Sequence, residues 1–215
     1  MTKYIAEFLG VFALVFLGGG AIIVNSITNG AVGLIGIALA HGIALVFSIY
    51  SFASISGAHF NPAVTIAMLI NKRINTEDAF GYIVAQLLGG VVAAGILSFL
   101  FPAVPATVAY GFPTEVPMIF GIVLEAILTF FLLSTIYGVA INKKATSGVF
   151  GFAIGATIIA DILMGGTQTG AAMNPARTFG PALLNGFLAN QPIYWIGPIL
   201  GAIIASLIYE KLIEK

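Results

Sequence analysis

The chain has 215 residues, of which 60% are hydrophobic and 7% charged, and its formal net charge is zero. An average soluble domain has about 25% charged residues, so the composition excludes a soluble protein, whose apolar core would lack a polar surface to cover it. Cysteine is absent, which excludes disulfides and thiolate metal sites; we expect no metal, no cofactor and no nucleic-acid partner.

Six apolar stretches follow one another along the chain, each close to the ~20 residues that a helix needs to cross a hydrocarbon core about 30 Å thick. They cover residues 4 to 24, 32 to 55, 80 to 101, 118 to 140, 148 to 165 and 193 to 212. The first runs on into NSITNG without a cleavage site of small residues, so we expect it to be retained. The sequence therefore predicts an all-α membrane protein, with a single transmembrane domain over residues 1–215.

The basic residues indicate how the chain is oriented in the membrane. Seven of the eight lie before the first stretch, between the second and third, between the fourth and fifth, or at the end of the sixth: Lys3, Lys72, Arg73, Lys143, Lys144, Lys211 and Lys215. With an even number of spans these regions share one side, which the positive-inside rule makes the cytoplasm. We therefore expect both termini to be cytoplasmic, and only Arg177 departs from the pattern.

Two polar segments interrupt the apolar chain: GAHFNPAVT at 57–65 and GAAMNPART at 170–178. Glu7 in AEFLG is similarly echoed by Glu125 in LEAIL. The repeating unit has three spans, with an Asn-Pro-Ala segment after the second. Because three is odd, the second copy enters the membrane from the opposite side, which predicts an inverted repeat of residues 1–108 and 115–215.

Each Asn-Pro-Ala segment predicts the start of a short helix, since Asn is favoured at the N-cap and Pro at the first helical position. These residues are Asn61, Pro62 and Ala63 in the first copy and Asn174, Pro175 and Ala176 in the second. After Asn61 about nine apolar residues follow, which as a helix cover only ~13 Å, or half of the hydrocarbon core. We expect the two half-helices to meet at the midplane.

Two helix N-termini at one point make the centre of a pore hostile to cations, because each is equivalent to about half a positive charge. If each asparagine caps its own helix through its side-chain oxygen, its NH2 group remains to donate into the pore. A water held by two such donors turns its hydrogens outward, which interrupts a proton wire. The pattern therefore predicts passage of a small neutral molecule and exclusion of protons and cations.

With these two motifs, HFNPAVT and MNPARTFGPA, the chain resembles the aquaporin or major intrinsic protein family from Glu7 through Tyr209. The resemblance implies an aquaporin-like bundle of six tilted transmembrane helices plus two half-helices around one pore per subunit, assembled as a homotetramer in the lipid bilayer. It also implies a passive water channel rather than an enzyme.

Arg177 is the third residue of its half-helix, where a positive charge opposes the helix dipole and is costly at membrane depth. The matching residue of the first copy is the apolar Val64. We interpret Arg177 as a fixed cation and hydrogen-bond donor at the outer constriction. The alternative is a side chain that reaches out to the membrane surface.

The resemblance implies that three further residues share this constriction, giving a selectivity filter of His41, Ile162, Ala171 and Arg177. This set departs from the Phe-His-Cys-Arg of strict animal water channels and the Trp-Gly-Phe-Arg of glycerol facilitators. It is similar to that of plant vacuolar aquaporins, some of which also pass ammonia or urea. Thr178 and Ala182 stand where glycerol facilitators have Asp and Lys, which disfavours glycerol as the main substrate.

Other polar residues of the predicted spans and loops are costly to place in a membrane, so a role is expected for each. His41 could instead be a core histidine bonded to a neighbouring carbonyl. His59 is expected to line the inner vestibule, where a role in pH gating is conceivable. As in the family, Glu7 and Glu125 are expected to be structural, accepting hydrogen bonds from the loops before the half-helices. For Asp161 we expect a hydrogen-bonded partner between helices.

Other functions remain open at this point. A channel whose main cargo is ammonia or another small neutral solute would have the same architecture. An ion-coupled secondary transporter also uses inverted repeats and broken helices, but the midplane here offers two neutral amides instead of an ion-coordinating group. A junctional or adhesive protein would need sticky external loops, and those here are short and nearly uncharged.

Overall fold

The computed structural model describes residues 1–104, 115–146, 148–185 and 188–213. The described residues are helical with connecting loops and contain no strand. Six long elements cross the molecule: α1 (Thr2–Ile27), α2 (Gly33–Ser56), α4 (Thr76–Leu100), α6 (Met118–Ile136), α7 (Phe150–Gly165) and α9 (Gln191–Ile213). The two half-helices are α3 (Pro62–Ile70) and α8 (Pro175–Asn185). The predicted fold is thus confirmed, while the expected boundary between the repeats falls on residues 105–114, outside those described.

The helix ends differ from the predicted stretches where polar residues take part in a helix. α4 begins at Thr76, four residues before the apolar stretch, because the side-chain oxygen of Asn75 caps it by accepting from the backbone nitrogen of Asp78 at 2.8 Å. Among the described residues, five helices are long and apolar enough to span a membrane, counting the π-helical turn Tyr137–Ile141 that extends α6. The sixth, α7, has 16 residues and is therefore about 24 Å long.

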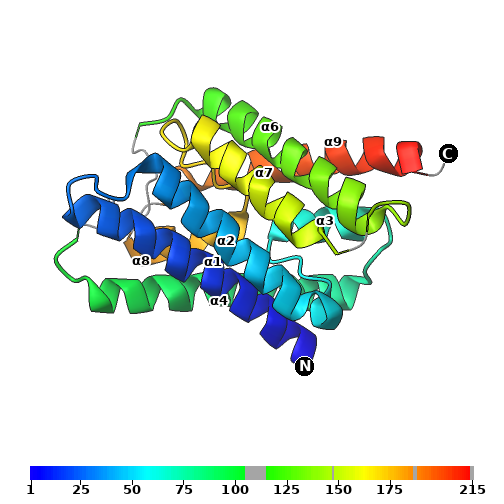
Figure 1. Cartoon of the computed structure of the whole chain (residues 1–215), viewed down its shortest axis with the longest axis horizontal. Coiled ribbons are helices and arrows are strands. Elements are labelled where there is room, and N and C mark those ends of the chain that lie inside the picture. Colours follow the sequence, from blue (N-terminus) through cyan, green and yellow to red (C-terminus); the bar gives the residue numbers. More distant parts are fainter. Residues whose placement is uncertain (105–114, 147, 186–187, 214–215) are drawn as a thin grey trace.

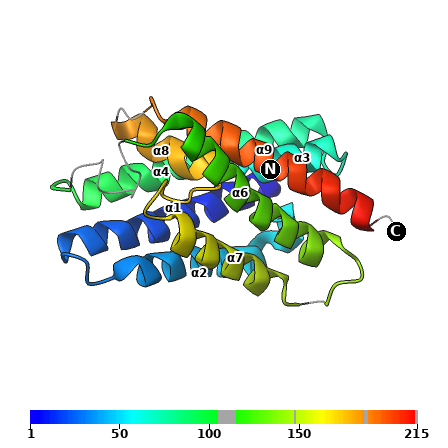
Figure 2. The ribbon, with the colours of Figure 1, turned by 90° about the horizontal axis from the view of Figure 1, so that it is seen from above.

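The packing of the helices follows the repeat (Figures 1 and 2). In the first half α1 packs against α2 and α4, and in the second half α6 packs against α7 and α9. Each half-helix packs on the long helix that ends the other half, α3 on α9 and α8 on α4, while α2 meets α7 at the centre. Exchanging the two halves therefore maps the packing onto itself, as an inverted repeat requires.

Close contact between helices depends on glycine at defined positions. A Cβ on Gly180 of α8 would lie 2.6 Å from the backbone nitrogen of Val91 and closer still to Gly90, both in α4. A Cβ on Gly155 of α7 would lie 2.7 Å from the carbonyl oxygen of Gly42 in α2. Small residues let helices approach closely in lipid, where packing rather than the hydrophobic effect drives association.

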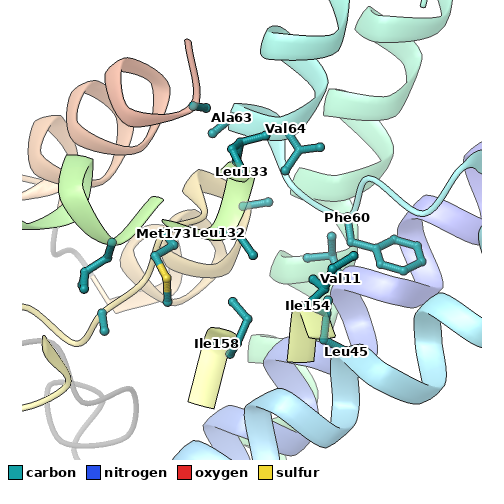
Figure 3. Packing of buried hydrophobic residues seen from close by; sticks show 14 of the residues in the cluster. Val11, Leu45, Phe60, Ala63, Val64, Leu132, Leu133, Ile154, Ile158 and Met173 are labelled. Carbon is teal, nitrogen blue, oxygen red and sulfur yellow. The ribbon is translucent and has the colours of Figure 1, made fainter. Parts of the chain in front are cut away.

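The buried apolar side chains of the main cluster come from all six long helices, from both half-helices and from the loops before them (Figure 3). Figure 3 labels Val11 of α1, Leu45 of α2, Phe60 of the loop before α3, and Ile154 and Ile158 of α7 within this cluster. Outside, large apolar side chains such as Phe80, Phe99 and Ile119 are exposed. Such a surface is stable only against lipid or a further subunit.

Figure 1 shows both termini and the α3–α4 and α6–α7 connections at one end of the molecule, and these connections contain the charged residues Lys72, Arg73, Lys143 and Lys144. Among the residues described at this end, Lys3 Nζ forms an ion pair with Asp78 Oδ1 at 2.6 Å, and Arg73 Nε forms one with Glu210 Oε1 at 2.6 Å. Hydrogen bonds to Glu210 raise the pKa of the Arg73 guanidinium above its ordinary value. The same end also carries the exposed Lys143 and Lys144.

Candidate functional site

The two half-helices begin in the same way. The side-chain oxygen of Asn61 accepts from the backbone nitrogen of Ala63 at 2.9 Å. That of Asn174 accepts from the nitrogens of Ala176 at 3.0 Å and Arg177 at 3.3 Å. With Pro62 and Pro175 at the first helical positions, these caps confirm the predicted helix starts.

The asparagine amides also bond across to the opposite loop, which the sequence did not indicate. Nδ2 of Asn61 donates to the carbonyl oxygen of Met173 at 2.7 Å, and Nδ2 of Asn174 donates to that of Phe60 at 2.8 Å. Each accepting residue directly precedes the other motif's asparagine. An NH2 group has two hydrogens, so each asparagine spends one on the opposite loop and keeps a second.

Both loops adopt the left-handed backbone conformation at matching non-glycine positions. Ala58 and Phe60 have φ of 55° and 50°, and Ala171 and Met173 have φ of 41° and 53°. Such φ values are uncommon for residues with a Cβ. Residues held in strained conformations cluster at functional sites, where the surrounding structure over-determines them. Here the hydrogen bonds of the asparagines and of two buried carboxylates hold the loops.

Glu7 is fully buried and accepts four hydrogen bonds. Its Oε1 accepts from the hydroxyl of Ser56 at 2.6 Å and the backbone nitrogen of His59 at 3.0 Å. Its Oε2 accepts from the backbone nitrogen of Phe60 at 2.6 Å and from Nε2 of Gln86 at 2.7 Å. The carboxylate thereby satisfies the backbone donors of the loop before α3.

Glu125 does the same in the second repeat and is also fully buried. Its Oε1 accepts from the hydroxyl of Thr169 at 2.7 Å and the backbone nitrogen of Ala172 at 2.9 Å, and its Oε2 accepts from that of Met173 at 2.7 Å. Buried polar groups left without such partners would cost about 1–3 kcal/mol each.

Four supporting residues were missed from the sequence, although they obey the repeat. Ser56 and Thr169 each stand five residues before the motif asparagine. The hydroxyls of Tyr82 and Tyr194 donate to the carbonyl oxygens of Ser56 and Thr169, both at 2.7 Å. The signal was present in the repeat, because the segment YIVAQLLGG from Tyr82 is echoed by YWIGPILGA from Tyr194, and the two tyrosines stand at matching positions.

A cavity of about 590 Å³ runs along the half-helix starts. It is lined by seven of the sequence-predicted site residues: His41, His59, Asn61, Ile162, Ala171, Asn174 and Arg177. Arg73, Asn142 and Thr146 line it at the charged end. The wall between is mostly apolar. Pro62, Ala63, Pro175 and Ala176 start the half-helices without lining the cavity, and Glu7 and Glu125 lie behind its wall.

The Arg177 side chain is 5% exposed and lines the cavity. Its Nη1 donates to the carbonyl oxygens of Gly170 and Ala171, both at 3.0 Å. A guanidinium tied to the loop that precedes its own helix does not reach the membrane surface, so the alternative of an outward-reaching side chain does not fit. Val64, at the matching position, also lines the cavity.

His41 combines the two interpretations given above. Its Nδ1 lies 2.8 Å from the carbonyl oxygen of Ile37, one turn earlier in α2, and the ring also lines the cavity. A carbonyl can only accept, so Nδ1 carries the hydrogen and Nε2 of the neutral ring is an acceptor. Room for the ring comes from Gly18 of α1, where a Cβ would lie 2.7 Å from Cε1 and closer to Nε2.

The expected partner for Asp161 is not found. Asp161 is 6% exposed, lies off the cavity, and its Oδ2 has no hydrogen-bond partner among the described residues. It stands on the face of α7 that includes Gly165, where a Cβ would lie 2.7 Å from Leu128 of α6.

Comparison with known proteins agrees with this architecture. The family model "Major intrinsic protein" matches residues 1–209. Aquaporin NIP1-1 of Zea mays is 38% identical over 98% of this chain and 74% of its own length. Glycerol uptake facilitator protein-like 6 of Lactiplantibacillus plantarum is 41% identical over 96% of this chain and 95% of its own.

A solved structure has the same fold. The aquaglyceroporin from Plasmodium falciparum superposes with a TM-score of 0.85 at 28% sequence identity, covering 99% of this chain and 96% of its own. Because the family model and the relatives span nearly the whole chain, the assignment covers both repeats and both loops. The chain therefore belongs to the major intrinsic protein family, the aquaporins, and is a multi-pass integral membrane channel, not an enzyme, for the passive passage of water or small solutes.

Proposed function

We propose that water is the main molecule this channel conducts and that protons and ions are excluded. The observation that carries the proposal is the second amide hydrogen of Asn61 and of Asn174. One hydrogen of each NH2 group is spent on the opposite loop, and both side chains line the same cavity. The remaining hydrogens are donors for whatever occupies the cavity between the two helix N-termini.

Exclusion of protons follows from this arrangement. A water that accepts two hydrogen bonds from the asparagines has both lone pairs engaged, so its own hydrogens point away from the centre along the cavity. The waters on either side are then oriented in opposite senses, and a chain of proton transfers cannot pass. The positive ends of α3 and α8, each about half an elementary charge, add an electrostatic barrier to cations.

We assign selectivity at the outer end to His41, Ile162, Ala171 and Arg177. The buried guanidinium of Arg177 supplies a fixed positive charge, and Nε2 of His41 supplies an acceptor, while Ile162 and Ala171 form an apolar wall. A donor and an acceptor facing one narrow passage suit water, which offers both. The set lacks an aromatic wall for a carbon chain, which disfavours glycerol despite relatives whose names mention it.

The test is stopped-flow light scattering on proteoliposomes, with separate gradients of an impermeant osmolyte, glycerol and urea. An internal pH dye reports proton and ammonia flux in parallel. We expect fast water flux, slow glycerol and urea flux, and no proton leak above that of empty liposomes. Water flux no faster than in empty liposomes would contradict the proposal, and faster glycerol or ammonia flux would identify another main cargo.

We further propose that both termini face the cytoplasm and that four copies assemble as a homotetramer. The basic residues around Lys72 and Lys143 lie at the end that holds both termini, which supports the orientation. The apolar outer surface has area for contact with neighbouring copies as well as lipid. Protease protection of a C-terminal tag in sealed vesicles and native mass spectrometry from detergent test these two points.

A further inference from the structure

The two loops differ in one polar feature behind the cavity wall. In the first repeat, a hydrogen-bonded chain runs from Glu7 through Gln86 and Thr65 to His59, which lines the cavity. The second repeat has no such chain, because Gln86 is matched by Pro198 and His59 by Ala172. The hydroxyl of Thr178, which matches Thr65, instead lies 3.0 Å from the carbonyl oxygen of Pro175 and 3.3 Å from Oε1 of Gln191.

The orientation of the Gln86 amide is fixed by the carboxylate of Glu7. Nε2 of Gln86 lies 2.7 Å from Oε2 of Glu7 and 3.0 Å from Oγ1 of Thr65. A carboxylate only accepts hydrogen bonds, so the NH2 end of the amide must face it. The second hydrogen of that NH2 group then goes to Thr65, whose oxygen is therefore an acceptor towards Gln86.

Counting donors decides which nitrogen of His59 carries its hydrogen. Oγ1 of Thr65 lies 3.1 Å from the carbonyl oxygen of Asn61 and 3.1 Å from Nδ1 of His59. Thr65 has one hydroxyl hydrogen. If it goes to Asn61, Nδ1–H of His59 donates to Thr65 and all three contacts of the hydroxyl are hydrogen bonds. If it goes to Nδ1 instead, the contact with Asn61 is lost. The Nδ1–H tautomer thus makes one more hydrogen bond.

The other ring nitrogen faces the cavity. The ring of His59 packs edge to face on Tyr82, with centroids 5.2 Å apart, which holds its plane. With Nδ1 turned to Thr65, Nε2 is on the far side of the ring, and a Cβ at the cavity-lining Gly57 would lie 3.8 Å from it. Among the described residues, Nε2 has no hydrogen-bond partner and is not enclosed.

We propose that Thr65, held by Gln86, is a positioning residue that fixes His59 in the Nδ1–H tautomer, so that Nε2 presents a hydrogen-bond acceptor to the permeating molecule on the inner side of the asparagines. His41 presents an Nε2 acceptor at the outer constriction. Two donors at the centre then stand between two acceptors. A water leaving the centre in either direction points its hydrogens towards an imidazole nitrogen, which extends the opposed orientation of the water column.

The tautomer can be measured directly, because the chain has only two histidines. Solid-state NMR of 15N-histidine-labelled protein in lipid bilayers at neutral pH distinguishes a protonated from an unprotonated ring nitrogen, and a His41→Asn variant assigns the signals of His59. We expect the wild-type protein to carry the hydrogen on Nδ1 of His59. One net hydrogen bond changes an equilibrium by about 2- to 12-fold. Thr65→Val should therefore lower the ratio of the Nδ1–H tautomer to the Nε2–H tautomer by that factor.

Two further variants separate the proposal from a general disturbance. Thr65→Ser keeps the hydroxyl and should restore the wild-type spectrum. Thr178→Val is the same change at the matching position of the other repeat, whose loop contains no histidine. This variant should leave the tautomer ratio of His59 unchanged. Only variants that elute like the wild-type protein in size-exclusion chromatography, and are therefore folded, are compared.

A hydrogen on Nε2 of His59 in the wild-type protein would overturn the proposal even if no variant folds, and so would an unchanged ratio in Thr65→Val. The proposal rests on the proposed function only in naming water as the oriented molecule. The spectrum is read without any flux measurement, so its failure and the failure of the water-channel proposal are distinguishable.

Discussion

Gly18 leaves room for the ring of His41, and replacing Gly18 by a larger residue tests whether His41 forms part of the constriction. Gly18→Ala places a Cβ 2.7 Å from Cε1 of the His41 ring, whereas ordinary contact begins at 3.4 Å. The ring of His41 must therefore move at least 0.7 Å away from the new methyl group. Nε2 must move further than Cε1, because it lies closer to that methyl group. Nδ1 is anchored to Ile37, so the free edge of the ring has to swing, and the open space in front of it is the cavity.

The size of the effect follows from the strain. Inserting a methyl group into a packed interior costs about 1–3 kcal/mol. A permeating molecule that has to push the displaced ring back works against this strain, and a barrier raised by this amount slows flux about 5- to 150-fold, since each 1.36 kcal/mol is a factor of ten. We therefore expect Gly18→Ala to lower water flux at least about fivefold per channel.

Stopped-flow light scattering with matched protein density measures this change. Gly20→Ala is the control on the same helix, because its Cβ would meet Leu97 at an ordinary 3.7 Å; its flux should equal that of the wild type. The double variant Gly18→Ala, His41→Ala removes the clashing ring and should recover most of the flux. Wild-type flux in Gly18→Ala, or a double variant as slow as the single one, would refute the assignment of His41 to the constriction.

Arg177→Val should raise proton leak at least about tenfold while water still passes, because a fixed charge a few ångströms away repels a cation by about 4 kcal/mol at an effective dielectric constant of 20; unchanged leak in the pH-dye assay would remove Arg177 from the filter. His41→Ala should widen the passage and increase urea or glycerol flux, and no increase would argue against its placement. Glu125→Leu leaves three buried donors without an acceptor, about 1–3 kcal/mol each, so we expect little folded protein by size-exclusion chromatography and more from Glu125→Gln. Gly180→Ala should prevent the close packing of α8 on α4; a wild-type melting temperature would show that the helices can separate at no cost.

The fold was predictable because the membrane imposes a length on each helix and the repeat imposes symmetry. Apolar length located the six spanning elements, and the half-helix starts followed from the preference for Asn at the N-cap, at Asn61 and Asn174, and for Pro at the first helical position. Hydropathy misplaced the start of α4, since its first turn, Thr76 to Asp78, is polar and capped by Asn75. Hydropathy measures what lipid tolerates, whereas helix ends are set by hydrogen bonds.

The site was predictable only in part, because its hydrogen bonds cross between the repeats. Nothing in the sequence indicates that the amide of Asn61 bonds to the carbonyl of Met173, since any residue could supply that carbonyl. The prediction of a hydrogen-bonded partner for Asp161 was wrong for a related reason. Its neighbours on α7 do not indicate which side chains of other helices oppose it, and a single sequence does not tell whether a buried carboxylate has a partner until those helices are placed.

The bonds between the loops have a consequence for how the protein is made. The partner of Asn61 lies 112 residues further along the chain, and translation at about 5–20 residues per second takes roughly 6 to 22 s to reach it. During that interval α3 and its loop are in or near the membrane, with strained backbone at Ala58 and Phe60 and the amide of Asn61 without its acceptor. Until the second half has been made, the polar groups of the first loop therefore have to be hydrated or shielded by the insertion machinery.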